Sequence, residues 1–137
     1  FWWQGRFFDR LTPHAWLQWA AAASVLRFVL TAALGAQIAV LVLAQALHLL
    51  TFAAQHAACI AIITRHFPGA LRGRGQALYT VLGYGVSGVV GGLAGGWLST
   101  QFGIRAVFWA AVGAAALGWW CALRSGRADR IARPAPP

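Results

Sequence analysis

The chain has 137 residues, of which 60% are hydrophobic and 9% are charged, and its formal net charge is +9. Soluble domains carry about 25% charged residues, so this composition is typical of an integral membrane protein. A nucleic-acid-binding protein would gather its basic residues on a polar face, whereas these arginines lie between long apolar stretches. The composition therefore argues against a nucleic-acid partner.

The chain contains no methionine and begins with FWWQGR, which lacks the basic region of a signal peptide. We therefore expect a piece of a longer protein, in which residues 1–8 are the end of an earlier helix. Cys59 and Cys121 each lie in an apolar stretch, where a thiol usually serves as a small packed side chain. They predict neither a disulfide framework nor a metal site, and no motif indicates a cofactor.

Four stretches are long and apolar enough to cross a bilayer, since a spanning helix needs about 20 mostly apolar residues. They cover residues 15–34, 38–63, 76–100 and 106–123. The expected fold class is therefore an all-α membrane protein with four transmembrane helices. Residues 1–123 form its transmembrane portion, and the polar, proline-rich residues 124–137 are expected to be a disordered cytoplasmic tail.

Arginines near the helix ends predict the orientation of the bundle, because Lys and Arg favour the cytoplasmic side. If the loop of residues 5–16 is cytoplasmic, that side collects nine arginines and the other side only Arg105. The nine are Arg6, Arg10, Arg65, Arg72, Arg74, Arg124, Arg127, Arg130 and Arg133. The absence of lysine beside abundant Ala and Gly indicates a GC-rich bacterial genome. We therefore expect a multi-pass protein of the bacterial inner membrane with a cytoplasmic C-terminus.

Two loops share a pattern that indicates an internal repeat. In the first, Gly5 is followed after three residues by Asp9 and Arg10 and then by a turn into a helix. In residues 96–105, GWLSTQFGIR, a glycine near a helix end is likewise followed by a polar pair and a turn. A helix-turn-helix unit used twice is expected of transporters built from repeats.

The first loop resembles the signature of the major facilitator superfamily, in which Gly, three residues, Asp and a basic residue join two helices. Gly5, Asp9 and Arg10 match this signature, whereas Thr12 and His14 replace a later Gly and Arg. In that superfamily the loop is a cytoplasmic gating loop, which agrees with the arginine distribution. The resemblance thus implies a gating role for Gly5, Asp9 and Arg10, weighed against a plain solvated turn.

Residues 45–98 are similar to helices ten and eleven of the branch that contains 3-phenylpropionate transporters and nucleoside–proton symporters. This resemblance covers almost the whole chain. It implies helices nine to twelve of a twelve-helix fold, so the N-terminal half of the same protein is an expected partner.

Arg27 lies within the first predicted span, where a charged side chain costs at least ~2.5 kcal/mol on insertion scales. Either it snorkels to the membrane interface, or it faces a cavity and pairs with an anionic substrate or with an acid elsewhere in the protein. The two acids of this chain, Asp9 and Asp129, are both expected on the cytoplasmic side. Arg27 is therefore the strongest candidate for a substrate or proton pathway.

A polar stripe on the second span falls within about 100° of the helix circumference. It consists of Gln45, His48, Phe52, Gln55, His56 and Cys59. Such a stripe faces protein or water, and hydrogen bonds to neighbouring helices would explain it as well as a cavity. The resemblance places this helix along the central cavity and makes Gln45, His48, Phe52 and Gln55 candidate pathway residues.

His48 suits proton coupling, because an imidazole both donates and accepts and titrates near neutral pH. The placement resembles proton/sugar symporters, in which an Arg on helix nine and a His on helix ten act with a Glu one turn further on. That third position is Thr51 here, so the acid comes from elsewhere or the coupling ion differs. His56 lies about 12 Å from His48 along the helix, too far for a shared metal, and His14 and His66 are expected to have no special role.

Two tracks of small residues on the third span let another helix approach closely. The first track is Gly83, Ser87, Gly91 and Gly95, and the second is Gly88, Gly92 and Gly96. We expect them to pack against a helix of the other half of the protein. Tyr79, Thr80 and Tyr84 near the start of this span are candidate cavity groups, with ordinary packing as the alternative.

These observations predict a secondary active transporter that moves a small organic solute by alternating access, with protons as the coupling ion. The first expectation for the substrate is an aromatic or other organic acid, and nucleosides and sugars are alternatives. No nucleophile–base pair indicates an enzyme. A non-transporting assembly or scaffold protein of the same fold and a self-contained four-helix oligomer are rival interpretations.

Overall fold

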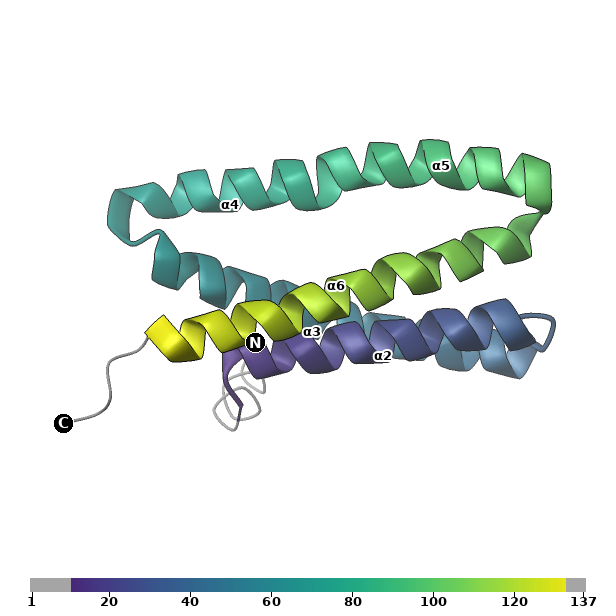
Figure 1. Cartoon of the computed structure of the whole chain (residues 1–137), viewed down its shortest axis with the longest axis horizontal. Helices are drawn as coiled ribbons and strands as arrows, with labels where there is room; N and C mark the ends of the chain where they lie inside the picture. The colour runs from purple at the N-terminus through teal and green to yellow at the C-terminus, as the bar shows by residue number, and fades with distance from the viewer. Residues whose placement is uncertain (1–10, 133–137) are drawn as a thin grey trace.

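The computed structural model describes residues 11–132, and their backbone is almost entirely helical (Figure 1). Helix α2 covers Pro13–Leu34, α3 covers Ile38–His66 and α6 covers Ile104–Ala132. Between α3 and α6 runs one long rod, Gly69–Phe102. It consists of the 3-10 turn η1 (Gly69–Leu71), helix α4 (Arg72–Thr80), the π-helical turn η2 (Val81–Val86) and helix α5 (Ser87–Phe102).

The helix ends follow from local sequence. The Thr12 hydroxyl accepts a hydrogen bond from the backbone N–H of Ala15 at 3.2 Å, and Pro13 stands at the first helical position, as is typical of helix starts. Pro68 cannot continue α3, and Gly69 takes a positive φ of 59°. Gly103 makes the turn between α5 and α6 with a φ of 80°, which glycine adopts without steric strain.

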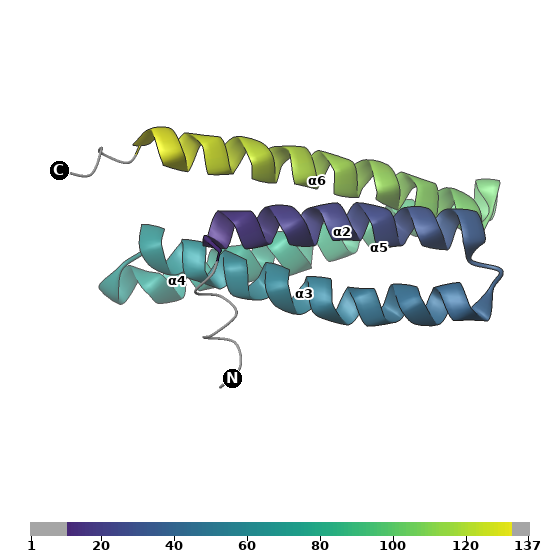
Figure 2. The ribbon, with the colours of Figure 1, turned by 90° about the horizontal axis from the view of Figure 1, so that it is seen from below.

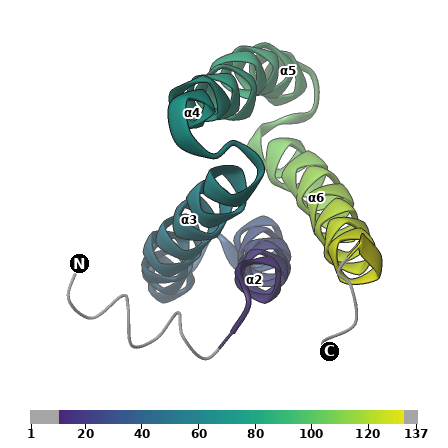
Figure 3. The same cartoon turned by 90° about the vertical axis from the view of Figure 1, so that its left-hand side faces the viewer.

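Helix α2 packs along both α3 and α6, whereas the α4–α5 rod contacts α3 and α6 over shorter stretches (Figures 2 and 3). The buried apolar residues that join these helices are small: Ala20, Ala32, Ala44, Ala58 and Ala122. Small side chains let helix backbones approach closely, which is the usual way in which helices associate within membranes. The core of the described part of the chain is therefore built from alanines.

Large apolar side chains cover the outside of the bundle. Leu93 is 73% exposed, Ile38 is 78% exposed and Trp19 is 67% exposed, and no large side chain of the described residues is fully buried. In water such a surface would be strongly unfavourable, but lipid tails and further helices solvate it well. All four long helical segments have the length and hydropathy needed to cross a membrane. The predicted all-α membrane fold with four spanning helices is confirmed.

The fourth span is longer than the sequence predicted. Helix α6 continues to Ala132, so the expectation of a disordered tail is wrong for residues 124–132. The polar extension is held by packing, because Gly126 lies against His14 and Gln18 of α2 and the Asp129 carboxylate reaches Arg65 of α3. Residues 133–137 lie outside the described residues.

The first two spans agree closely with the predicted ranges, whereas the third begins earlier and contains an unpredicted π-helical turn. The predicted second span 38–63 extends by less than one turn to His66, and the predicted third span 76–100 begins earlier, at Gly69. The first turns of this third span contain glycines and arginines. These residues lower the hydropathy without breaking the helix, so the apolar stretch begins later than the helix. The π-helical turn Val81–Val86 was not predicted, because no proline marks it.

The helix ends gather into two groups. The beginning of α2, the end of α3, the beginning of α4 and the end of α6 lie at one end of the bundle (Figure 1). We call this the arginine-rich end, because it carries Arg65, Arg72, Arg74, Arg124 and Arg127. Arg105 lies at the opposite end, beside the last turn of α2. The separation agrees with the charge asymmetry from which the orientation was predicted.

Candidate functional site

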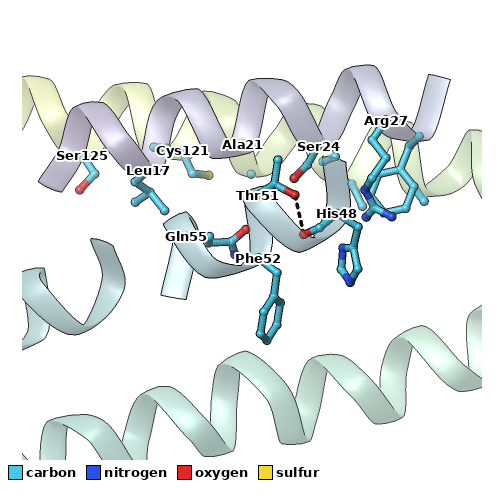
Figure 4. A pocket seen from close by; sticks show the side chains of 16 residues that line it. Leu17, Ala21, Ser24, Arg27, His48, Thr51, Phe52, Gln55, Cys121 and Ser125 are labelled. Atoms are coloured by element: carbon cyan, nitrogen blue, oxygen red, sulfur yellow. Dashed lines mark hydrogen bonds between the residues drawn. The ribbon is translucent and has the colours of Figure 1, made fainter. Parts of the chain in front are cut away.

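A cavity of about 620 Å³ lies among α2, α3 and α6 (Figure 4). Its walls are mainly apolar, with alanines of α6 opposite Leu17, Ala21 and Phe28 of α2. The polar side chains on the facing parts of α2 and α3 are Ser24, Arg27, His48, Thr51 and Gln55. An apolar cavity with a few convergent polar groups is the common form of a small-molecule site.

Arg27 contributes the one charged side chain among the residues that line this cavity. Its guanidinium carbon lies 4.1 Å from the centre of the Phe28 ring, and its Nε is buried without a hydrogen-bond partner among the described residues. The described range contains one acid, Asp129, which lies at the arginine-rich end. A guanidinium offers five N–H donors, so Arg27 retains donors for a ligand that enters the cavity.

The predicted polar stripe of α3 divides between two sides of the helix. Thr51, which was not part of the predicted stripe, is 5% exposed and faces the cavity, and its hydroxyl donates to the His48 carbonyl oxygen at 3.2 Å. The side chains of His48 and Phe52 point away from α2, toward the α4–α5 rod (Figure 4). Gln55 also lines the cavity, whereas Gln45 is exposed and lies outside it.

The structure thus brings together four of the five predicted pathway residues: Arg27, His48, Phe52 and Gln55. The residues of the predicted gating loop, Gly5, Asp9 and Arg10, lie outside the described residues. Their role is a prediction that the structure does not address.

The glycine tracks of the rod face open space. A methyl group built at Gly88, Gly91, Gly92 or Gly96 would meet no atom within 4 Å, whereas one at Gly95 would lie 3.6 Å from Val107 of α6. The Ser87 hydroxyl bonds within its own helix, to the Gly83 carbonyl. A methyl group at Gly83 would lie 3.4 Å from the Tyr79 ring, so among the described residues the glycines of the two tracks other than Gly83 and Gly95 are uncovered.

A second set of interacting polar side chains joins α3 to the rod, and the predicted site did not include it. The His56 Nδ1 lies 3.1 Å from the Tyr84 hydroxyl, which lies 3.2 Å from the Tyr79 hydroxyl. The Phe52 ring stacks on the His56 imidazole with an interplanar angle of 11° and a centroid distance of 6.3 Å. Tyr79 and Tyr84 were predicted as candidate cavity groups and His56 as part of the polar stripe, but the contact between these side chains was not predicted.

An ionic cluster ties three helices together at the arginine-rich end. The Asp129 Oδ2 lies 3.6 Å from the His14 Nδ1 and 3.9 Å from a terminal guanidinium nitrogen of Arg65. His14 is 7% exposed, so this contact is partly shielded from water. The sequence reasoning missed the cluster because it placed Asp129 in a disordered tail and expected no role for His14.

Four helices long and apolar enough to span a membrane, three of which line a cavity with one charged side chain among its described lining residues, define a multi-pass membrane protein. A family model described as the MFS_1 like family matches residues 1–110, and the chain belongs to this family of the major facilitator superfamily. Searches of curated proteins and of solved structures gave no match. Membership supports a transporter rather than an enzyme, and a small-molecule substrate and a lipid bilayer as its partners.

Proposed function

We propose that the protein is a proton-linked secondary transporter that carries a small organic acid, in the first place an aromatic one, by alternating access. The observation that carries the proposal is Arg27, whose Nε is buried in the wall of an apolar cavity without a partner among the described residues. A cation at this depth is costly unless something compensates it. A carboxylate in the cavity would supply that compensation.

The surroundings of Arg27 favour a carboxylate attached to an apolar body. A guanidinium binds a carboxylate with two parallel N–H···O bonds, which fixes the orientation of the anion. Phe28 offers aromatic surface beside the guanidinium, Phe52 lines the same cavity from α3, and the alanines of α6 offer a smooth apolar wall. His48 and Gln55 would contact the polar part of the same substrate. Neutral nucleosides and sugars would leave the charge of Arg27 uncompensated.

The proposal also includes the orientation of the protein in the membrane and the source of the opposite wall of the cavity. By the charge rule, the arginine-rich end faces the cytoplasm of a bacterial inner membrane, with the C-terminus on that side. The N-terminal half of a twelve-helix protein would supply the opposite wall of the cavity. The uncovered glycine tracks of the rod would pack against a helix of that half and slide during alternating access.

The proposal is tested by uptake of radiolabelled 3-phenylpropionate into liposomes that contain the purified full-length protein. We expect Arg27→Ala to raise KM about 10- to 100-fold, the equivalent of one lost hydrogen-bonded charge contact, and Arg27→Lys to raise it less. His48→Ala should change uptake and its pH dependence. Arg124→Ala is the matched control, because Arg124 is exposed and lies over the Trp120 ring instead of in the cavity.

Three outcomes would contradict this assignment. Unchanged uptake in both Arg27→Ala and His48→Ala would remove the cavity from the substrate pathway. Uptake of uridine or lactose in place of the acid would show that the substrate class is wrong. A protein that moves none of these solutes but copurifies with a membrane complex would support the scaffold interpretation.

A further inference from the structure

The π-helical turn η2 creates a side-chain pair that a regular helix would separate. Tyr79 and Tyr84 are five residues apart, and at 100° per residue their side chains would point about 140° away from each other. The wider turn at Val81–Val86 holds one residue more, so Tyr84 takes the place that a residue one regular turn after Tyr79 would occupy. Their ring centres lie 5.5 Å apart and their hydroxyl oxygens 3.2 Å apart.

The pair meets an imidazole from another helix. His56 of α3, which precedes Tyr84 by 28 residues, places its Nδ1 3.1 Å from the Tyr84 hydroxyl. Its ring centre lies 5.9 Å from that of Tyr79 and 6.3 Å from that of Phe52. His56, Tyr84 and Tyr79, which we call the imidazole–tyrosine triad, are therefore connected by two successive hydrogen bonds at bilayer depth. Turns of this type occur often at functional sites.

The titratable groups around His56 come from three helices. On α3 itself these are His48, on the far side of Phe52, and Cys59, which interacts with Tyr79. The rod contributes the two tyrosines, and Arg27 of α2 lines the cavity that His48 and Phe52 also line. Within the described residues no acid faces the triad. A proton on His56 would therefore be stabilised by hydrogen bonding and by the face of the Phe52 ring, without a neighbouring carboxylate.

Protonation of His56 would reverse the hydrogen bonds of the triad. When the neutral imidazole carries its proton on Nε2, the Nδ1 accepts from the Tyr84 hydroxyl, and the Tyr84 oxygen can accept from the Tyr79 hydroxyl. When a proton from water binds the imidazole, both ring nitrogens become donors. The Nδ1–H then donates to the Tyr84 oxygen, and the Tyr84 hydroxyl turns to donate to Tyr79. No bond to carbon changes, and the tyrosines stay neutral in both states.

We propose that His56 is the proton-binding residue of this transporter, that Tyr84 and Tyr79 position it, and that η2 is the element on which its protonation acts. The inference rests on the proposed proton-linked transport and deepens it. His48 fits this role less well, since its ring contacts Phe52 but forms no hydrogen bond to the described residues. The π turn joins the two tyrosines, so a reversal of their hydrogen bonds acts directly on the rod that carries the glycine tracks.

The first test measures protonation without any substrate. Nitrogen-15 NMR of histidine-labelled full-length protein in nanodiscs follows each imidazole between pH 5 and 9, and the His56 signal is identified by its loss in His56→Gln. We expect the His56 signal to depend on pH and to change in Tyr84→Phe, because the imidazole loses its hydrogen-bond partner. Tyr79→Phe should produce a smaller change. A His56 signal that is independent of pH, or that Tyr84→Phe leaves unchanged, would overturn the proposal.

The second test separates proton coupling from substrate binding. In liposomes loaded with unlabelled 3-phenylpropionate, counterflow of the labelled compound needs binding and alternating access but no net proton movement. We expect His56→Gln to retain counterflow and to lose at least 90% of the accumulation driven by a pH gradient. His66→Gln is the matched control, because its Nδ1 bonds within α3 to the Ile62 carbonyl and it lies outside the triad.

The two tests have independent outcomes, one for the protonation site and one for proton coupling and substrate. Full accumulation in His56→Gln would overturn the assignment of the coupling proton, whatever the NMR shows. If the unaltered protein neither accumulates nor exchanges the compound, the proposed substrate class is wrong. A titration of His56 that responds to Tyr84→Phe would in that case still support His56 as the protonation site.

Discussion

Arg105, near the beginning of α6, donates from its Nε to the carbonyl oxygen of Ala32 in the last turn of α2 at 3.0 Å. A terminal nitrogen of the same guanidinium lies 3.4 Å from the carbonyl oxygen of Ala33. The last carbonyl groups of a helix lack partners within it and carry partial negative charge. Arg105, the single charged residue that residues 11–132 place near this end of the bundle, therefore caps the end of α2 and fixes the start of α6 against it.

Removal of this cap should lower the stability of the bundle. We expect Arg105→Ala to reduce the free energy of unfolding by about 1–2 kcal/mol, because it removes a charge-assisted hydrogen bond and a favourable interaction with the helix terminus. Unfolding in mixed micelles, followed by tryptophan fluorescence, measures the effect. Arg105→Lys should recover part of the loss, and Arg124→Ala should change stability by less than about 0.5 kcal/mol. Equal stability of Arg105→Ala and the unaltered protein would show that the contact contributes nothing.

Substitution of two glycines of α4 by alanine should change the stability of the protein in opposite directions. A methyl group at Gly75 would lie 2.7 Å from the Cγ of Phe67 and 2.9 Å from the Cγ2 of Ile63, whereas one at Gly73 would meet nothing within 4 Å. We expect Gly75→Ala to destabilise the protein by about 1–3 kcal/mol through overpacking. Gly73→Ala should stabilise it by up to about 1 kcal/mol, since alanine favours helix over glycine. The same sign for both would refute the close packing of Gly75.

The ionic cluster at the arginine-rich end should stabilise the folded protein mainly through the contact between Asp129 and His14. His14 and Asp129 have side chains that are 8% and 17% exposed, whereas the Arg65 side chain is 46% exposed. In double-mutant cycles with Asp129→Asn, we expect a coupling free energy of about 0.5–1.5 kcal/mol with His14→Ala and a smaller one with Arg65→Ala. A larger coupling for Arg65 would reverse this ranking.

The uncovered glycine tracks predict a helix partner that the described residues do not supply. We expect Gly92→Leu in the full-length protein to reduce the rate of counterflow at least tenfold, because a large side chain there would push the partner helix away. Ala94→Leu is the matched control on the same helix, since Ala94 is exposed and lies on neither track. If both variants transport equally well, the tracks face lipid.

Hydropathy was sufficient to predict the four spans, because the thickness of the bilayer sets the length of an apolar spanning helix. It failed at residues 124–132, where the polar extension of α6 stays helical through tertiary contacts of Gly126 and Asp129. Hydropathy reports transfer into lipid and contains no information on such contacts. The end of an apolar stretch is therefore not the end of its helix.

Individual site residues were predictable from their own apolar stretches, whereas contacts between two helices were not. Arg27, His48 and Gln55 follow from polar residues in apolar stretches, and the structure places all three along one cavity. The contact between His56 and Tyr84 depends on the packing of α3 against the rod and on an irregular turn. A helical projection with a fixed 100° step places Tyr84 on the wrong side and conceals the contact.

The alanine core of the bundle has a mechanical consequence. Five small residues have no side-chain rotamers: Ala20, Ala32, Ala44, Ala58 and Ala122. Helices that meet through them have no interdigitating side chains that must move before one helix shifts along the other. Leucine or isoleucine at these positions would resist such a shift by steric collision. Along these alanine contacts, helices α2, α3 and α6 are held by backbone proximity and dispersion, whereas polar contacts of Arg105 and Asp129 join them near the two ends of the bundle.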